Sequence, residues 1–566
     1  MASQIEEKVF NCIDKNRSFK IEAGAGSGKT WTLIQSLLYI IKTKGEAFKN
    51  NMQQVACITY TNVAKNEISS RIQSSKLVKV STIHEFLWDI IKPFQHELRI
   101  ELKNYICEKI ELKQKELSSI KNHNTKKYIG LQETVERYVI SLKSFEEYKG
   151  NINYCDKPKW RKGEISHDEL LDIANSIIKK YHNIHKIIND VYPIIFVDEY
   201  QDTSPKVKEI LLDYLKPNTS ILLGFFGDYI QQIYDSSIGR IDGAQYDLEL
   251  IVKTENYRSS TEVINILNKI RSDITQSQSG IEKHGKCLFY YLNNEDLNTE
   301  DFIQNRVKLD LSIGDSNIKK LYLTTKSIAI KNGYVELHDL YEKTDFKNKD
   351  QLLKNKDNRD CPFANYLFDI EEIIVLYNEK RIQSMLKKVP RSINNFNDKT
   401  KMRESLEQLI IKMEHETIGD VFKFVNDNQI QVMSDKLISY FNKSELQDEF
   451  FNEIINLKYS QFRRLYNTVK ESSPFSTNHG TKGAEYDNVV CVINDNDWNK
   501  YNVNKYLDKS DFETSRYDRT EHLFYVICSR AKYNLAIVFL SILTDEAIKR
   551  AKYLFGESNF VDLSNG

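Results

Sequence analysis

The chain has 566 residues, of which 80 are basic and 80 acidic, so its formal net charge at pH 7 is zero. This length predicts several domains, and the balanced charge excludes a uniformly basic nucleic-acid-binding protein, so any nucleic-acid surface must come from local clustering. The eight cysteines include no C-x-x-C pair, which argues against a zinc site or a disulfide framework. The first residues lack a signal-peptide pattern and no apolar run reaches membrane length, so we expect a cytoplasmic protein without membrane contact.

The strongest local signal is Ile21–Thr30, with the sequence IEAGAGSGKT. Phe19–Ile21 predicts a short buried strand before it, and the apolar spacing of Trp31–Ile41 predicts a helix behind it. A glycine-rich turn at a helix N-terminus cradles phosphates, with Lys29 reaching the β- and γ-phosphates and the Thr30 hydroxyl ligating Mg²⁺. The cradle residues are Ala23, Gly24, Ala25, Gly26, Ser27 and Gly28. The strict pattern begins with glycine rather than alanine, and a turn without a ligand is the alternative interpretation.

Polar and aromatic side chains follow the next two predicted strands, Val55–Ile58 and Val78–Val80. They are Tyr60, Thr61 and Asn62 after the first strand and Ser81, Thr82 and His84 after the second. At the carboxyl edge of a parallel sheet, such groups suit contacts to a ligand or to a single nucleic-acid strand. Ordinary helix capping by Thr61 or Ser81 is the alternative.

From about Lys92 to Tyr192 the pattern is long, charged and helical, apart from an irregular stretch at Tyr148–Lys162. This stretch interleaves basic residues with aromatic ones, a combination that can grip phosphates and stack bases. A solvated loop with a few packed aromatic side chains is an equally good interpretation.

A second strong signal is the apolar run Tyr192–Val197, which predicts a buried strand ending in Asp198 and Glu199. Two adjacent acids in that position are costly unless they serve an ion or a reaction. In a P-loop enzyme, Asp198 would hold Mg²⁺, and Glu199 would orient and deprotonate the attacking water. The next predicted strand, Ser220–Phe226, leads to Gln231, which is suited to sensing the γ-phosphate.

Together these segments resemble the UvrD/Rep/PcrA group of superfamily 1 DNA helicases. Six motifs occur in the family's order: AGAGSGKT, TYTN, TIH, DEYQDT, GDYIQQIY and NYRS. Two more, STNHGTKGAEYD at 476–487 and YVICSRAK at 525–532, resemble the family's fifth and sixth motifs. Each of these precedes an apolar run that predicts a strand, Val489–Ile493 and Leu535–Phe539.

The resemblance implies an α/β protein with two RecA-like P-loop domains built on parallel sheets, each with a mainly helical insertion. The first RecA-like domain would comprise residues 1–92 and 185–252, with its insertion at 93–184. The second would comprise residues 253–342 and 465–566, with a reduced insertion at 343–464. ATP would bind between the two RecA-like domains.

The resemblance also implies roles for single residues, beyond those of the cradle. Catalysis would fall to Lys29, Glu199, Gln231 and two arginine fingers, Arg258 and Arg530, which come from the far domain in the family. Nucleotide contacts would come from Gln4 at the adenine edge, Tyr257 on the base and Glu485 near the ribose. The track for single-stranded DNA would be lined by Tyr60, Thr61, Asn62, Thr82, His84 and His479.

Three features depart from the family pattern. Ser236 and Ser237 stand where relatives carry a tryptophan that stacks on a base, a contact worth about 1–3 kcal/mol. Trp31 stands where relatives have a basic residue; its indole either stacks on adenine or packs in the core, and we favour packing. Between residues 341 and 465, Gly419 is the only glycine, so the glycine-containing turns with which relatives grip duplex DNA are missing.

We therefore expect a DNA-dependent ATPase that uses ATP and Mg²⁺ to move along single-stranded DNA, 3′ to 5′ as in the family. The alternative is a helicase-like DNA sensor that regulates a separate nuclease subunit, as in Gabija-type antiphage systems. The reduced DNA grip and the lack of a fused nuclease domain favour this alternative somewhat. An ATP-binding scaffold without chemistry is disfavoured, because Lys29, Glu199, Gln231 and both arginines are present.

Overall fold

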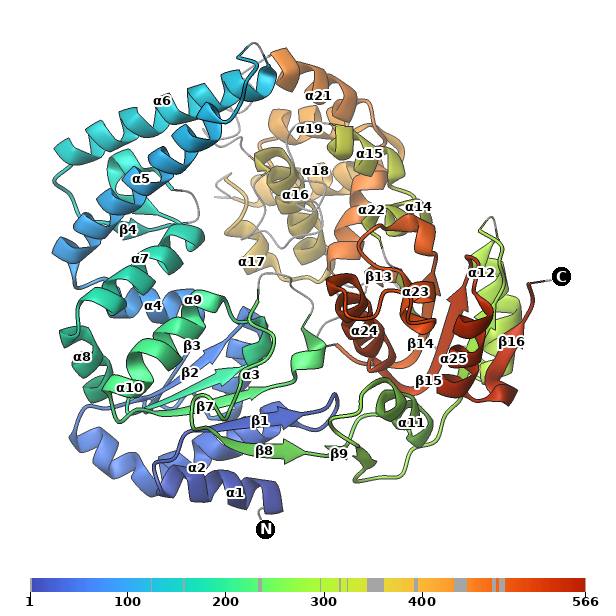
Figure 1. Ribbon diagram of the computed structural model, residues 1–566. Coiled ribbons are helices and arrows are strands. Elements are labelled where there is room, and N and C mark those ends of the chain that lie inside the picture. Colours follow the sequence, from blue (N-terminus) through green and yellow to red (C-terminus); the bar gives the residue numbers. More distant parts are fainter. Residues whose placement is uncertain are drawn as a thin grey trace. The chain divides into compact units, whose positions relative to one another are not determined.

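The computed structural model describes residues 3–564 apart from 124, 156–157, 233–236, 296, 315–316, 323, 344–360, 391–394, 432–444, 471–474 and 478–483. By its internal contacts the chain divides into two compact units, whose helices and strands are labelled in Figure 1. Unit 1 consists of Met1–His284 and Glu521–Ser529, and unit 2 consists of Gly285–Thr520 and Arg530–Gly566. Each unit contains a six-stranded sheet in which every strand pairing is parallel.

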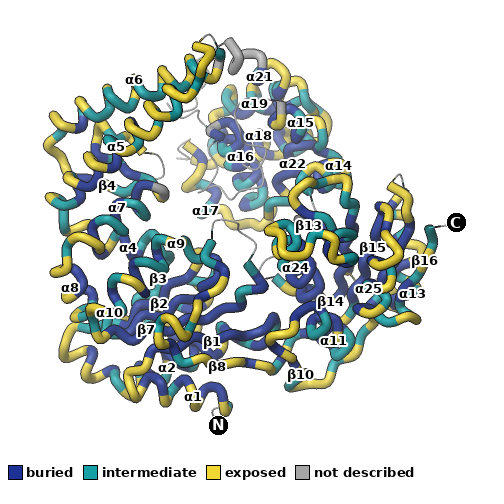
Figure 2. The backbone as a smooth tube through the Cα atoms, viewed as in Figure 1, coloured by how far each residue is buried: buried dark blue, intermediate teal, exposed yellow. Residues whose placement is uncertain are grey.

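The sheet of unit 1 has the strand order β3-β2-β6-β7-β1-β8. Its strands are β1 (Phe19–Ala23), β2 (Val55–Thr59), β3 (Val78–Thr82), β6 (Ile194–Asp198), β7 (Leu222–Gly227) and β8 (Glu249–Lys253). Strands β1, β2 and β7 are buried along their whole length (Figure 2), and so is β6. Burial on both faces explains why they appear in the sequence as nearly continuous apolar runs.

Helices precede, connect or follow these strands, and some of them close a core against the sheet. They are α1 (Gln4–Asp14), α2 (Lys29–Asn50), α3 (Asn62–Arg71), α4 (Ile83–Ile91) and α11 (Thr261–Ile270). Val9 of α1, Ile21 of β1 and Leu37 of α2 belong to the same buried cluster. The starts of α1 and α4 are fixed by capping boxes, in which a Ser or Thr side chain and a Glu three residues later satisfy free N–H groups.

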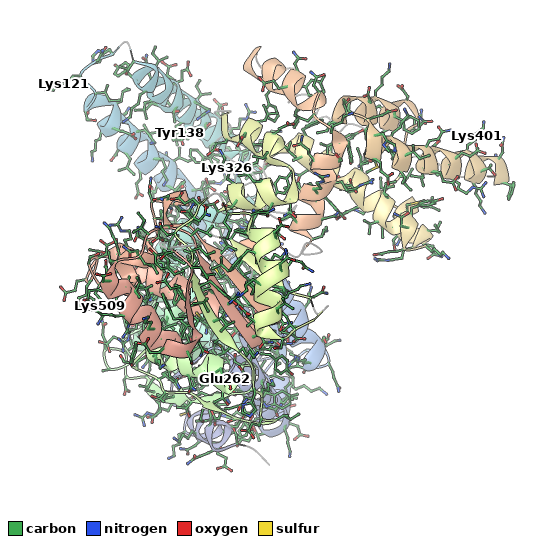
Figure 3. All side chains as sticks on the ribbon, turned by 90° about the vertical axis from the view of Figure 1, so that its right-hand side faces the viewer. Lys121, Tyr138, Glu262, Lys326, Lys401 and Lys509 are labelled. Atoms are coloured by element: carbon green, nitrogen blue, oxygen red, sulfur yellow. The ribbon has the colours of Figure 1, made fainter. Side chains whose placement is uncertain are left out.

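A mainly helical part of unit 1 lies between β3 and β6. It contains α5 (Gln95–Ser118), α6 (Lys126–Glu147), α7 (His167–Lys180), α8 (Asn183–Val191) and the short parallel pair β4 (Asn153–Tyr154) and β5 (Glu164–Ile165). Tyr138 of α6, labelled in Figure 3, packs with its ring 4.8 Å from that of Trp160. The remaining elements of unit 1 are η1 (Trp160–Lys162), η2 (Tyr200–Asp202), α9 (Pro205–Lys208), η3 (Glu209–Leu215), α10 (Lys216–Asn218), η4 (Tyr229–Gln231), β9 (Glu255–Asn256) and β10 (Ser277–Gln278).

The sheet of unit 2 has the order β13-β12-β14-β15-β11-β16. Its strands are β11 (Cys287–Tyr291), β12 (Lys319–Tyr322), β13 (Phe475–Thr477), β14 (Tyr486–Ile493), β15 (Ala531–Phe539) and β16 (Phe560–Asp562). The helices are α12 (Thr299–Phe302), η5 (Ile303–Val307), α13 (Lys308–Leu311), α14 (Thr325–Asn332), α15 (Val335–Lys343), α16 (Pro362–Asn378), α17 (Ile382–Leu386), α18 (Phe396–His415), α19 (Ile418–Asp427), α21 (Glu445–Ile455), α22 (Tyr459–Val469), η9 (Asp495–Asp497), α23 (Val503–Leu507), α24 (Ser515–Cys528), α25 (Asp545–Phe555) and η10 (Glu557–Asn559). Helix α24 begins in unit 2 and ends in unit 1.

The helices before β13 share one buried cluster with the sheet of unit 2. Gly419 lies in α19, and a Cβ added there would be 3.0 Å from Cβ of Ile455 in α21. Close helix packing therefore accounts for the single glycine of this segment.

The expected parallel-sheet α/β architecture is confirmed, and so are the strands expected in both halves of the chain. The assignment of both sheets to RecA-like domains stays a prediction, as do the domain ranges; unit 1 runs to His284, past the expected boundary at residue 253. Within the described ranges, none of the helices is both long and apolar enough to cross a bilayer.

Candidate functional site

The carboxyl ends of six strands define one edge of the unit 1 sheet. Because all the pairings are parallel, Thr82, Thr59, Asp198, Gly227, Ala23 and Lys253 end their strands at this same edge. In open α/β sheets, ligands bind at this edge. The P-loop, the acidic pair and the Gln231 segment all follow directly from it.

The P-loop turns sharply between β1 and α2. Gly28 precedes α2 with a φ of 79°, in the left-handed region that favours glycine, and no described side chain caps the N-terminus of this helix. Its first N–H groups are therefore available to an anion. Gly26 has a φ of 74°, and a Cβ there would lie 2.6 Å from Oδ1 of Asn256. Ala23 lies inside β1 and is buried, so the departure from the strict pattern falls where a Cβ is tolerated.

Asp198 and Ser27 present buried oxygens with nothing to bind. Within the described residues, Oδ1 of Asp198 and Oγ of Ser27 have no hydrogen-bond partner. Burial, with the nearby Glu199 carboxylate, raises the pKa of Asp198 to about 7. A divalent cation would reverse this shift and satisfy the orphaned oxygen, so the site fits a Mg²⁺–nucleotide. Nζ of Lys29 donates to the Ala23 carbonyl at 3.2 Å, within the phosphate cradle.

Glu199 follows β6 in a strained backbone conformation, with φ 47° and ψ 48°. Such strain costs about 1–3 kcal/mol and clusters at active sites. Its Oε2 accepts a hydrogen bond of 2.5 Å from Nε2 of Gln201, whose side chain is fully buried. A donor at this distance fixes the carboxylate that is expected to orient water.

Gln231 is buried in η4, and its Nε2 donates to Oδ2 of Asp228 at 2.7 Å. The backbone N–H of Asp228 donates to Oε1 of Gln201 at 3.1 Å. Gln201 and Asp228 therefore join the expected catalytic base, Glu199, to the expected phosphate sensor, Gln231.

Two exposed aromatic side chains flank the start of α2. A Cβ added to Gly28 would lie 3.8 Å from Cβ of Trp31 and 3.9 Å from Cδ2 of Tyr257. The two residues are 53% and 47% exposed, respectively. The expectation that Trp31 packs in the core is therefore wrong: its ring is in solvent, and its Nε1 donates to Oε1 of Glu6 at 3.0 Å. Gln4 is exposed at the first position of α1, two residues before Glu6.

The two expected arginine fingers lie in different units. Arg258 is in unit 1 beside the P-loop, since a Cβ on Gly26 would lie 2.7 Å from its Cβ, and its Nη1 donates to the Ser529 carbonyl at 3.3 Å. By its contacts Arg258 lies in the same unit as the P-loop, and its assignment to the second RecA-like domain stays a prediction. Arg530 is a buried residue of unit 2 whose Nη1 donates to the Ala484 carbonyl at 3.1 Å.

The expected DNA-track residues of unit 1 lie after β2 and at the end of β3. Tyr60 is 49% exposed, and Thr61 and Asn62 are exposed with it. The Thr61 hydroxyl caps α3, as the alternative interpretation held, whereas α4 is capped by Thr82 instead of Ser81. The ring of His84 lies 4.5 Å from that of His167.

Two residues singled out in the sequence fall outside the described residues. His479 and Ser236 belong to the ranges 478–483 and 233–236. Glu485 is described: it is exposed and pairs with Lys532 at 3.2 Å.

The basic and aromatic stretch Tyr148–Lys162 combines packed rings with exposed charges. Trp160 packs against Tyr105 and Tyr138, and its Nε1 donates to Glu169 at 3.3 Å. The described basic residues of the stretch are exposed. Packing explains its aromatic side chains, as the second interpretation proposed.

Several site residues were not singled out in the sequence. They are Glu6, Gln201, Asp228, Asn256, Arg271, Gln276 and Tyr525. Nδ2 of Asn256 and Nε2 of Gln276 both donate to the Ala25 carbonyl, at 2.9 and 3.0 Å. Gln201, Asp228, Asn256 and Tyr525 belong to the recognised motifs, so motif position offered a signal, whereas Arg271 and Gln276 have none.

Comparison with known proteins is consistent with this geometry. Residues 3–245 match the family model "UvrD/REP helicase N-terminal domain". The Gabija protein GajB of Bacillus cereus (strain HuB5-5) is 28% identical over 668 aligned residues, covering 97% of this chain and 96% of that protein. GajB of strain VD045 is 22% identical, covering 92% of each chain. The ATP-dependent DNA helicase Rep of Buchnera aphidicola is 28% identical, but over 45% of this chain and 40% of Rep.

Proposed function

We propose that this chain, which is similar to UvrD/Rep/PcrA-type ATP-dependent DNA helicases, translocates along single-stranded DNA, 3′ to 5′, by hydrolysing ATP–Mg²⁺ at the carboxyl edge of the unit 1 sheet. The observation that supports this most strongly is the orphaned Oδ1 of buried Asp198 at the same edge as the uncapped start of α2. A cation ligand and an anion site side by side suit a metal-bound triphosphate.

The position of each residue suggests its role in ATP hydrolysis. Lys29 and the first N–H groups of α2 hold the phosphates, while Thr30 and Asp198 hold Mg²⁺, which neutralises charge on the phosphoryl oxygens. Glu199, fixed by Gln201, accepts the proton of the attacking water.

The nucleotide base would lie against the exposed rings beside Gly28. Trp31 and Tyr257 offer two faces for stacking. Gln4 would add donor and acceptor groups at the adenine edge, and Glu485 of unit 2 would approach the ribose.

Translocation requires that hydrolysis depend on closure between two RecA-like domains, which we propose for the two sheets. Arg530 of unit 2 would reach the γ-phosphate on closure, with Arg258 acting from the P-loop side. Tyr60, Thr61, Asn62, Thr82, His84 and His479 would line the strand's track. Alternate closing and opening then moves the strand.

The test is directional. The protein, ATP and Mg²⁺ are incubated with oligonucleotides that carry streptavidin on a biotin at either the 3′ or the 5′ end. Faster displacement from the 5′ end, dependent on ATP, supports 3′-to-5′ movement. Equal, ATP-independent rates at both ends would refute translocation.

A second candidate is a helicase-like ATPase that senses DNA for a separate nuclease in antiphage defence. Similarity to two GajB proteins over nearly the whole of each chain favours it, because the match to Rep covers less than half of each. The adjacent gene distinguishes the sensor from a free-standing helicase. For the sensor, we expect this gene to encode a nuclease that co-purifies with this chain. A chain without such a neighbour would favour a free-standing helicase.

A further inference from the structure

A buried arginine without a role in the proposed chemistry contacts Asp228, the residue that follows β7. Arg271 follows α11, and its side chain is 1% exposed. Its Nε and Nη2 donate to the two carboxylate oxygens of Asp273 at 2.9 and 2.8 Å. Burial alone would raise the pKa of Asp273, but the hydrogen bonds from Arg271 bring that pKa below its usual value. This forked pair fixes the plane of the guanidinium.

The remaining guanidinium nitrogen of Arg271, Nη1, bonds the fully buried Asp228. Nη1 donates to both carboxylate oxygens of Asp228, at 3.0 and 3.1 Å. Oδ2 of Asp228 also accepts from Gln231, and its backbone N–H bonds Gln201, the partner of Glu199. Arg271 therefore neutralises the carboxylate that holds Gln231, and it fixes the residue whose backbone N–H holds Gln201 beside Glu199. Removing a partner from a buried charge pair is costly, because the other charge is left without compensation.

Nη1 of Arg271 makes a third contact, with the hydroxyl of Tyr525 at 3.1 Å. The same hydroxyl oxygen accepts a hydrogen bond of 3.2 Å from the backbone N–H of Ala25 in the P-loop. Burial, with the charge of Asp228, raises the pKa of Tyr525 to about 12, so the hydroxyl is neutral at physiological pH. All these residues belong to unit 1.

One chain of buried hydrogen bonds thus joins the P-loop to the catalytic side chains. It runs from Ala25 through Tyr525, Arg271 and Asp228 to Gln231, and through Gln201 to Glu199. Buried networks of this kind rigidify a site when each member is satisfied. Tyr525 lies in the segment that leads directly to Arg530, so the network also contacts the element that precedes the proposed finger.

We infer that Arg271 and Tyr525 are positioning residues of the ATPase, which hold the P-loop, Gln231 and Glu199 in one arrangement; this inference rests on the proposed function of the site. Neither residue is part of the phosphate cradle Ala23–Gly28, although Tyr525 bonds the Ala25 N–H within it; Arg271 holds Asp228, which bonds Gln231 and, through Gln201, leads to Glu199. Loss of the network therefore slows hydrolysis and leaves nucleotide binding nearly intact.

The experiment uses Tyr525→Phe, which keeps the ring and removes the hydroxyl. Asp273→Asn is the milder second variant. Asp273 is 29% exposed, and its substitution weakens only the contacts of Nε and Nη2 of Arg271. Tyr39→Phe is the matched control, because it removes an exposed hydroxyl that bonds Asp14 at 2.7 Å away from the network. Steady-state ATPase with and without oligothymidine, affinity for a fluorescent ADP analogue, and thermal unfolding are measured for each protein.

We expect Tyr525→Phe to lower kcat about 10- to 100-fold, the scale of a displaced catalytic group, with KM for ATP and ADP affinity changed less than about threefold. Asp273→Asn should lower kcat about 3- to 10-fold in the same pattern, and Tyr39→Phe should match wild type. Unchanged kcat in folded Tyr525→Phe and Asp273→Asn overturns the inference, as does a loss of kcat that only follows a loss of folded protein. If DNA does not stimulate ATP hydrolysis by the wild-type protein, the proposed translocase function is contradicted instead. The inference about Arg271 and Tyr525 is then tested by comparing the kcat of each variant with that of wild type in the absence of DNA.

Discussion

At the scale of single residues, Lys29 and Glu199 act on the nucleotide in different ways, because one anchors phosphates and the other activates water. We predict that Lys29→Ala weakens nucleotide binding, whereas Glu199→Gln keeps binding and loses about 10²–10⁴-fold in turnover. Nucleotide affinity and steady-state ATPase measure both effects, with Lys42→Ala, an exposed lysine of α2, as the control. Near-normal turnover by Glu199→Gln would remove this residue from catalysis.

Trp31 offers a spectroscopic report on the same site. Its indole is exposed beside the P-loop and tied to Glu6, so a nucleotide base that stacks on it removes it from water. We predict that saturating ATP changes tryptophan fluorescence and that Trp31→Phe abolishes the change, with nucleotide affinity reduced about 5- to 10-fold for a stacking contact of about 1 kcal/mol. Trp498→Phe, in unit 2, is the control. A full fluorescence change in Trp31→Phe would place the base elsewhere.

At the scale of elements, the turn between β1 and α2 depends on glycine for two separate reasons. Gly26 has a positive φ, and a Cβ there would collide with Asn256. We predict that Gly26→Ala abolishes high-affinity nucleotide binding and destabilises the protein by at least about 1 kcal/mol. Gly130→Ala is the matched control: Gly130 lies within α6 with nothing within 4 Å of its added Cβ, and alanine there should stabilise by about 0.5–1 kcal/mol. Nucleotide affinity and thermal unfolding are measured for both variants. A Gly26→Ala protein that binds ATP normally would contradict the P-loop geometry.

Elements of this fold could be predicted from the sequence because parallel strands buried on both faces have an unambiguous pattern. The apolar runs before Gly24, after Gln54 and before Asp198 each became a strand, and the motif residues came together because their strands end at one edge. Local patterns were weaker at helix starts: Thr82, and not Ser81, caps α4, because the Glu three residues later completes its capping box.

Contacts between distant segments left no such pattern. Trp31 begins an apolar helix pattern in the sequence, yet its Nε1 donates to Glu6 of α1, a contact across 25 residues. Arg271 is a single charged residue at a helix end, and its place in a buried network depends on Asp228 and Tyr525, which lie far from it in the chain. Only the folded arrangement shows which charges share a buried site.

At the scale of the whole molecule, the protein should move along DNA better than it separates strands. Ser236 and Ser237 replace the family's stacking tryptophan, and Gly419, the only glycine between residues 341 and 465, is used for helix packing. We predict weak, poorly processive unwinding of tailed duplexes by the protein alone, with binding that weakens steeply as salt rises. Unwinding is followed on 3′-tailed duplexes of increasing length. Efficient separation of long duplexes would show that another element, such as the exposed basic residues of Tyr148–Lys162, replaces the missing contacts.

ATP hydrolysis should drive movement of the protein along single-stranded DNA. The most direct measurement is the steady-state ATPase rate at saturating concentrations of oligothymidines of increasing length. A translocating protein takes more steps on a longer track before it reaches the end, so we expect an ATPase rate that rises with oligonucleotide length toward a plateau. A rate that DNA does not stimulate, or that is the same for every oligonucleotide long enough to fill the binding site, would contradict it.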